Sequence, residues 1–264
     1  MTIVLLRNAR LIDPETGTET DGSLLIENGV IRAVGSAVDT PAKDIKSIDC
    51  NGKVLAPGII DIGVKVCEPG ERHKESFKTA GQAAAAGGVT TIVTRPDTLP
   101  AIDTPETLEF TRRRANEAAP VNVLTMAALT KGRDGREMTE IGFLLDAGAV
   151  GFTDCDRVVT DTKVLTRALS YAGSLGALVM GHPQDPGLSK GAAATSGKFA
   201  SLRGLPAVSP MAERMALDRD IALIEMTGVR YHFDQITTGR ALPALRRAKN
   251  NGLDITAGTS IHHL

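Results

Sequence analysis

The sequence lacks the features that mark a secreted protein, a membrane protein or a protein built on a structural metal. It has three cysteines, Cys50, Cys67 and Cys155, and none stands in a CxxC or Cys/His spacing. An odd number without such spacing argues against a disulfide framework and a structural zinc site. No long apolar run opens the chain, because Arg7 and Asp13 interrupt it early, so we expect neither a signal peptide nor a membrane span. These absences predict reduced thiols and a cytoplasmic protein.

A large charge of either sign is also missing. The chain has 30 Lys and Arg residues against 31 Asp and Glu. A balance this close to zero gives no electrostatic reason to expect nucleic acid or a membrane surface as a partner. We therefore expect a small molecule or another protein. The 264 residues are 42% hydrophobic, which is enough for one large α/β domain with a small appendage.

The first 53 residues predict a small N-terminal β unit. Apolar residues alternate in short runs at 3–6, 24–26 and 30–34, and the turn-forming residues Pro14 to Gly17 and Glu27 to Gly29 separate them. Short runs divided by such turns are typical of antiparallel strands. We expect a domain boundary at residues 53 and 54, and we expect this unit to be one part of a composite β-sandwich.

From residue 54 to 264 the pattern changes to buried strands alternating with amphipathic helices. The predicted strands are 59–66, 89–94, 121–128, 150–153, 178–181, 229–236 and 255–258, and the predicted helices are 74–86, 105–118, 161–174, 210–226 and 240–250. Strands that are apolar on both faces, each followed by a helix, predict a parallel sheet. Seven of them fit a (β/α)₈ barrel better than an open sheet. The eighth strand of such a barrel is absent from the sequence, so we expect the barrel to be incomplete at its C-terminus.

The stretch 56–70, APGIIDIGVKVCEPG, is the most informative in the sequence. It resembles the first barrel strand of the dihydroorotases, a family of the amidohydrolase superfamily whose pattern is APGxxDxHxHxREPG. The resemblance continues in order through AAAAGGVTT at 83–91, RPDTLP at 95–100, HPQDP at 182–186, TTG at 237–239 and HHL at 262–264. It covers essentially the whole chain and implies a zinc site at the C-terminal mouth of the barrel, where the metal activates water to open a cyclic amide.

The residues that would hold this metal are largely replaced. Gly63 and Lys65 stand where the family has its HxH pair, and Gln235 stands where the HxxHVST pattern has its ligand histidine. Glycine offers no ligand, an ammonium repels a divalent cation, and an amide oxygen is a weak zinc ligand. The surviving metal candidates are His182, which matches the family's AHCEDP motif, and Asp154, although Cys155 occupies the second acidic position of the family's DDG stretch.

The substrate side is altered as well. Cys67 and Asp97 stand where the resemblance implies an arginine and an asparagine that grip the substrate carboxylate. A cysteine makes no bidentate contact, and an aspartate repels a carboxylate. Lys65 has no acid or base partner identifiable in the sequence, so no catalytic residue is assigned. The basic run at 112–114 predicts an exposed helix face that could dock a partner.

These observations leave three hypotheses of different classes. The first is a non-catalytic dihydroorotase homologue of pyrimidine biosynthesis, without cofactor, that forms homo-oligomers and supports aspartate carbamoyltransferase, as inactive forms of this kind do. The second is an active cyclic amidohydrolase with a reduced zinc site built on His182 and Asp154. The third is a protein that uses the old pocket for another ligand, with Lys65 and Asp97 as polar contacts. A fold alone does not decide among them.

Overall fold

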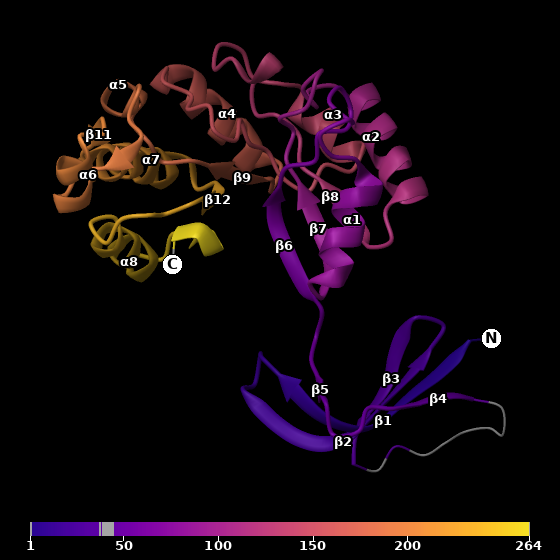
Figure 1. Cartoon of the computed structure of the whole chain (residues 1–264). Coiled ribbons are helices and arrows are strands. Elements are labelled where there is room, and N and C mark those ends of the chain that lie inside the picture. The colour runs from indigo at the N-terminus through magenta and orange to yellow at the C-terminus, as the bar shows by residue number, and fades with distance from the viewer. Residues whose placement is uncertain (1, 37, 39–44, 264) are drawn as a thin grey trace. The chain divides into compact units, whose positions relative to one another are not determined.

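The computed structural model describes residues 2–36, 38 and 45–263. Contacts divide the chain into two compact units, Met1–Ile59 and Ile60–Leu264. Helices in the described ranges fall short of the combination of length and apolar character that crossing a bilayer requires. Figure 1 shows the elements of each unit.

The first unit is a single five-stranded sheet. Its strands are β1 (Ile3–Asp13), β2 (Thr18–Glu27), β3 (Val30–Gly35), β4 (Lys46–Asp49) and β5 (Val54–Leu55). The first three form an antiparallel meander, with residues of both predicted turns at positive φ, as these tight turns require: 67° at Gly17, 50° at Asn28 and 80° at Gly29. The prediction of a purely antiparallel unit is wrong at its end, because β4 and β5 both pair with β1 in parallel.

The second unit is an arc of parallel strands in chain order. One sheet has the order β6 (Ile59–Val64), β7 (Val89–Thr94) and β8 (Asn122–Thr125), and another contains β9 (Leu178–Gly181), β12 (Arg230–Phe233) and β13 (Ile255–Ala257). Phe152 joins the two sheets, since it bridges Ala127 and Val179 in parallel. The predicted strand at 150–153 is thus reduced to a single bridging residue.

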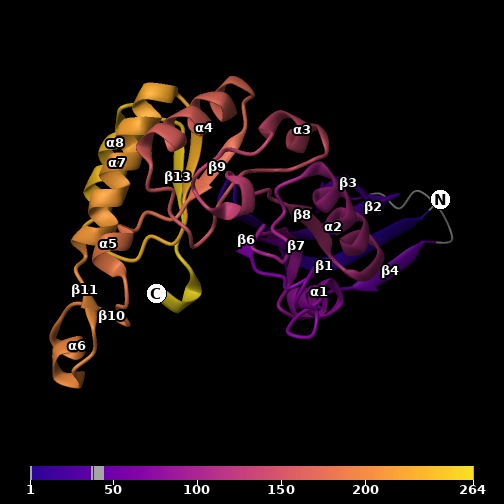
Figure 2. The ribbon, with the colours of Figure 1, turned by 90° about the horizontal axis from the view of Figure 1, so that it is seen from above.

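Helices cover the outer face of this arc, as the figures show (Figures 1 and 2). The covering helices are α1 (Phe77–Ala86), α2 (Pro105–Ala118), α3 (Ile141–Asp146), α4 (Thr162–Ser174), α7 (Met211–Thr227) and α8 (Leu242–Asn250). The short helices α5 (Pro186–Ser189) and α6 (Lys198–Arg203) lie in the connection between β9 and α7, and 3₁₀ turns occur at Lys131–Arg133 and Ile261–His263. Ser76 caps α1 through a capping box with Thr79, which explains why α1 begins later than its apolar pattern predicts. Two short strands, β10 (Ala194–Thr195) and β11 (Ala207–Val208), flank α6.

The main core lies between the strands and this outer layer. It contains the fully buried side chains of Phe152, Leu169, Leu217 and Phe233. Alternate strand residues point to the inside of the arc, where Val93, Met126 and Met180 form a separate buried cluster. This two-sided burial is what a (β/α)₈ barrel requires of its strands, and the predicted α/β barrel class is confirmed.

Candidate functional site

The C-terminal ends of the barrel strands carry the positions singled out in the sequence. Gly63 lies at the end of β6 and Asp97 follows β7. His182 directly follows β9, and Gln235 follows β12. Asp154 follows the bridging residue Phe152. Because neighbouring parallel strands end at the same edge, all of these positions belong to one mouth of the barrel.

Lys65 has a partner that sequence reasoning missed. Its Nζ lies 3.0 Å from Oδ2 of Asp97, across the neighbouring strands β6 and β7. The Lys65 side chain is 53% exposed, whereas that of Asp97 is only 4% exposed. A carboxylate buried to this degree is costly unless a cation compensates it. The ammonium at the end of the first barrel strand therefore compensates the charge of a buried carboxylate.

Arg95 extends this pair into a chain of charges. One guanidinium nitrogen of Arg95 lies 3.4 Å from Asp97 and 3.7 Å from Asp156, and Arg133 lies 3.2 Å from the same oxygen of Asp156. Three cations thus share two carboxylates. Asp97 was expected to repel a carboxylate, but Lys65 and Arg95 compensate its charge. No role was predicted for Arg95. Its place two residues before Asp97 in the RPD motif after β7 was the only local sign of this contact.

Three buried polar atoms in this region have no hydrogen-bond partner within the described part of the chain. They are Nε of Arg95, Oδ1 of Asp97 and Nε2 of His232. Buried polar atoms normally have a hydrogen-bond partner, so we expect each of these three atoms to bind a group other than the described residues. His232 lies on β12, whereas Arg95 and Asp97 follow β7, and β8 and β9 stand between those strands.

Asp154 is held by backbone and side-chain donors. Its Oδ1 accepts hydrogen bonds of 3.0 Å from the backbone N–H groups of Leu129 and Thr130, and its Oδ2 accepts one from the Thr130 hydroxyl. Burial raises the pKa of the Asp154 carboxyl, although the hydrogen bonds from Thr130 and Leu129 oppose the shift. These contacts tie the segment after Phe152 to the segment after β8.

His182 and Asp154 line the same small hollow, together with Cys155 and Tyr231. Its volume is about 30 Å³, which holds one or two water molecules, whereas small-molecule sites usually have roughly 300–1,000 Å³. Burial raises the pKa of the Cys155 thiol, so this cysteine lacks the thiolate character of a nucleophile. Cys67, the other altered position, is half-buried.

The backbone at this mouth is unusual at two of the altered positions. Cys155 has a φ of 60° and Gln235 has a φ of 52°. Residues other than Gly and Asn rarely adopt this left-handed backbone conformation. Gly63, with a φ of 79°, also lies there. Such conformations gather at functional sites more often than elsewhere.

The residues present do not fit the zinc site that the resemblance implies. Among the described residues, no group of three or more His, Cys, Asp or Glu side chains is arranged to hold a metal ion. Gly63 offers no donor, and the Lys65 ammonium is held by Asp97. Nδ1 of the buried His232 lies 2.7 Å from the Thr256 hydroxyl, which leaves Nε2 as the one ring nitrogen that this residue could offer. A zinc site needs three or four converging nitrogen, oxygen or sulfur ligands.

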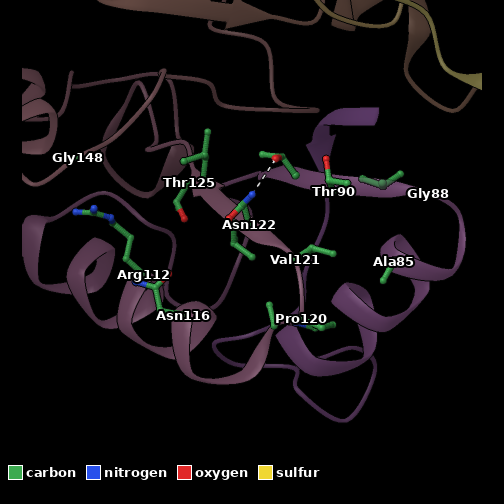
Figure 3. Close-up of a pocket in the computed structure, with 15 residues that line it drawn as sticks. Ala85, Gly88, Thr90, Arg112, Asn116, Pro120, Val121, Asn122, Thr125 and Gly148 are labelled. Carbon is green, nitrogen blue, oxygen red and sulfur yellow. Dashed lines mark hydrogen bonds between the residues drawn. The ribbon is translucent and has the colours of Figure 1, made fainter. Parts of the chain in front are cut away.

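A wide hollow of the second unit lies at the other end of the strands. It has a volume of about 980 Å³ and lies between the starts of β7 and β8 and the end of α2. Figure 3 shows Arg112, Asn116 and Asn122 around it. In barrels of this class the chemistry takes place at the C-terminal ends of the strands, so this hollow is separate from the candidate site.

The basic run of α2 is exposed at Arg112 and Arg113, as predicted, and also makes contacts within the unit. Arg114 lies 3.2 Å from the buried Glu68 and also pairs with Glu117, and Arg112 donates to the carbonyl of Ala147. The guanidinium of Arg113 lies 6.0 Å from the ring centre of Phe110. Two of the three arginines therefore make contacts within the unit, and the docking of a partner on this face stays a prediction.

Several known proteins with similar sequences are named dihydroorotase or dihydroorotase-like. Residues 52–241 match the family model described as Dihydro-orotase-like. The chain is 35% identical over 260 residues to a dihydroorotase of Syntrophus aciditrophicus and 40% identical over 257 residues to one of a Wolbachia species from Drosophila simulans. It is 39% identical over 266 residues to a dihydroorotase-like protein of Pseudomonas putida.

The alignments cover 98%, 97% and 100% of this chain but 61%, 58% and 62% of these relatives. The chain thus spans about six-tenths of their length.

Several solved structures with the same fold are hydantoinases. The L-hydantoinase of Arthrobacter aurescens superimposes with a TM-score of 0.81 at 21% identity, over 98% of this chain and 58% of that one. A D-hydantoinase of a Thermus species gives 0.78 at 22% identity, over 98% and 58%. At these identities the likeness supports the barrel fold alone. With the family match over residues 52–241, it follows that the chain belongs to the dihydroorotase-like family of the amidohydrolase superfamily.

Proposed function

We propose that this protein is a dihydroorotase homologue of pyrimidine biosynthesis that does not catalyse the reaction and acts as a structural or regulatory partner of aspartate carbamoyltransferase. The observation that carries the proposal is the 3.0 Å ion pair between Lys65 and Asp97. It puts a bound ammonium where the family pattern has an imidazole that binds metal. A divalent cation beside this ammonium would meet a like charge at short range.

The substrate side supports the same proposal. Cys67 offers no guanidinium for a carboxylate, and Asp97 is already engaged by Lys65 and Arg95. Arginine is the residue that recognises carboxylates by two parallel hydrogen bonds, and losing it together with the metal ligands removes both halves of the catalytic machinery. A barrel that keeps the remaining family motifs from residue 56 to 264 then needs a role that does not depend on turnover.

Aspartate carbamoyltransferase is proposed as the partner because inactive proteins that resemble dihydroorotase support the assembly of its catalytic subunits. Homo-oligomers of this chain and a cytoplasmic location belong to the same proposal. The balanced charge of the chain, 30 cations against 31 anions, suits association with proteins rather than with nucleic acid.

Co-expression with the aspartate carbamoyltransferase of the same organism tests this function. We expect the two proteins to elute together in one large complex during size-exclusion chromatography. The complex should persist when His182 is changed to Ala, since the metal candidate has no part in assembly. Separate elution, with a carbamoyltransferase that is fully active alone, would remove the reason for this proposal.

A second function has a specific observation in its favour. His182 follows β9, and His232 on the neighbouring strand β12 has a buried Nε2 without a partner in the described part of the chain. Two imidazoles could begin a reduced zinc site for an active cyclic amidohydrolase, as the names of the dihydroorotase relatives suggest. In that case His182→Ala should abolish both zinc binding and dihydroorotate hydrolysis.

A further inference from the structure

The connection between β9 and α7 differs in charge from the rest of the chain. Between Pro186 and Ala212 it contains Lys190, Lys198 and Arg203 and no Asp or Glu, whereas the whole chain has a net charge of −1. Figure 2 shows α6 at the far end of this connection, with β10 and β11 between it and α7. The three cations are exposed, so this projecting part is purely basic.

Large apolar side chains lie on the same projection. Phe199 is 67% exposed and Leu202 is 75% exposed, and their i,i+3 spacing puts them on one face of α6. Ala200 is buried and faces inward. The guanidinium of Arg203 lies 5.7 Å from the ring centre of Phe199, so a cation borders the apolar face directly.

Backbone hydrogen bonds hold this projection in shape. The N–H of Ala193 donates to the carbonyl of Pro206 at 2.8 Å, and the N–H of Ser196 donates to the carbonyl of Val208 at 2.8 Å. Gly204 ends α6 in the left-handed conformation, with a φ of 62°. A surface ordered before binding loses less entropy when a partner docks on it.

We propose that the α6 surface, defined as Lys198, Phe199, Leu202 and Arg203, docks on a protein partner whose contact area has carboxylates around an apolar depression. An exposed aromatic ring beside an arginine is the composition typical of interface hot spots. Lys198 and Arg203 have no Asp or Glu between Pro186 and Ala212 to balance them, so they select an acidic partner and repel a second basic surface. A helix of six residues buries too little apolar area to hold a membrane.

The proposal for the α6 surface depends on the proposed function only for the identity of the partner. A photo-reactive phenylalanine analogue, p-benzoylphenylalanine, at position 199 of the full chain tests it in cells of the source organism. The same analogue at Phe143, which is 65% exposed on α3, is the matched control. We expect a protein adduct from position 199 and none above background from position 143. The linked peptide, read by mass spectrometry, should contain Asp or Glu.

Charge reversal completes the test. Lys198→Glu with Arg203→Glu should reduce the adduct from position 199 about tenfold or more, because like charges then face each other. Leu202→Ser should reduce it without changing any charge. An unchanged thermal midpoint of each variant shows that the fold is intact, since all these side chains are exposed.

The outcomes separate the two proposals. An adduct with aspartate carbamoyltransferase supports both. An adduct with a different protein through an acidic peptide supports the α6 surface and contradicts the named partner. Adducts only with lipid, only with a second copy of this chain, or equal to those from position 143 overturn the α6 surface, even where carbamoyltransferase elutes with the protein.

Discussion

Asp97 is almost fully buried, and the stability of its charge depends on the cations beside it. Lys65 lies 3.0 Å away and Arg95 lies 3.4 Å away. Removing one partner of a buried carboxylate costs more than removing a surface pair, because the remaining charge stays in a poorly solvated place. The pair therefore has measurable consequences for folding as well as for metal binding.

We expect Lys65→Met to lower the free energy of unfolding by roughly 1–2 kcal/mol, since Arg95 still compensates part of the charge. Adding Asp97→Asn should recover part of this loss, and the double-mutant cycle measured by urea unfolding gives the coupling. Lys74→Met is the control, because its pair with Glu71 is exposed and should contribute within about 0.5 kcal/mol. Equal losses for both lysines would contradict an internal role for Lys65.

Restoring the lost imidazoles makes a second test at this scale. Gly63→His with Lys65→His should raise zinc affinity, because it adds two ligands to the mouth that already has His182. Hydrolysis of dihydroorotate should stay absent, since Cys67 and Asp97 are unchanged. Histidine at position 63 must adopt a φ near 79°, which costs roughly 1–2 kcal/mol. Zinc titration and turnover measure both effects, and robust turnover would show that the substrate-side losses matter less than proposed.

His232 predicts a pH dependence of stability. Burial lowers the pKa of its imidazole, and Asp234 opposes the shift. The folded protein thus keeps His232 neutral at a pH where the unfolded chain, with a pKa of about 6.5, already binds the proton. The contribution of neutral His232 to the free energy of unfolding is fully present above about pH 6.5. It is lost as the pH drops through the folded-state pKa. His232→Gln should make the decline below about pH 6.5 shallower, measured by urea unfolding, whereas Gln at the exposed His73 should leave it unchanged.

At the scale of single residues, the sequence identifies the altered positions but not their contacts. Gly63, Lys65, Asp97 and Gln235 are found by comparison with a motif, one strand at a time. The pairing of Lys65 with Asp97 depends on the register between β6 and β7, and residues 32 positions apart in the chain carry no local sign of it. Lys65, for which no acid partner was identifiable in the sequence, therefore has one in the structure.

Among the elements, the end of β6 is fixed to two helices by one buried carboxylate. Glu68 accepts hydrogen bonds from Arg114 on α2 and from the backbone N–H of Phe77 at the start of α1. Its acceptance of a helix N-terminal N–H also favours the negative charge. The same arginine pairs with Glu117, which is 55% exposed.

This contact predicts a clear difference between two glutamates that share one arginine. Glu68→Gln should lower the free energy of unfolding by roughly 1–3 kcal/mol, because a buried charge-assisted hydrogen bond is lost. Glu117→Gln should change it by less than about 0.5 kcal/mol, since its pair is exposed to solvent. Thermal or urea unfolding measures both, and similar effects would contradict the assignment of Glu68 as an anchor.

Elements with strong patterns were predictable and short ones were not. Apolar runs gave β7 and β9, and amphipathic spacing gave α2 and α4, with bounds close to those observed. The helices α3 and α6 have six residues each, too few to show a helical period above chance. β4 and β5 pair with β1 in parallel. This pairing depends on where the connecting loop brings the chain back beside β1, and local sequence patterns do not encode that position.

For the whole molecule, the barrel strands follow one another in chain order from β6 to β13, while the described residues contain no group of three or more His, Cys, Asp or Glu side chains that could hold a metal ion. Family resemblance predicted this fold from sequence because the motifs lie along the entire chain. Hydrolysis requires side chains from several strands to converge on one point in space. A sequence motif covers one strand at a time and does not show this convergence. The proposed role by association rests on the contacts that Lys65 and Arg95 make with Asp97.

Zinc content of the purified full chain, measured by elemental analysis after dialysis with dihydroorotate turnover in the same sample, tests this claim most directly. Structural and catalytic zinc sites retain their metal through dialysis because three or four ligands hold it. We predict far less than one equivalent of zinc per chain and no turnover above the background reaction. One or two equivalents of zinc, together with hydrolysis of dihydroorotate, would contradict the account.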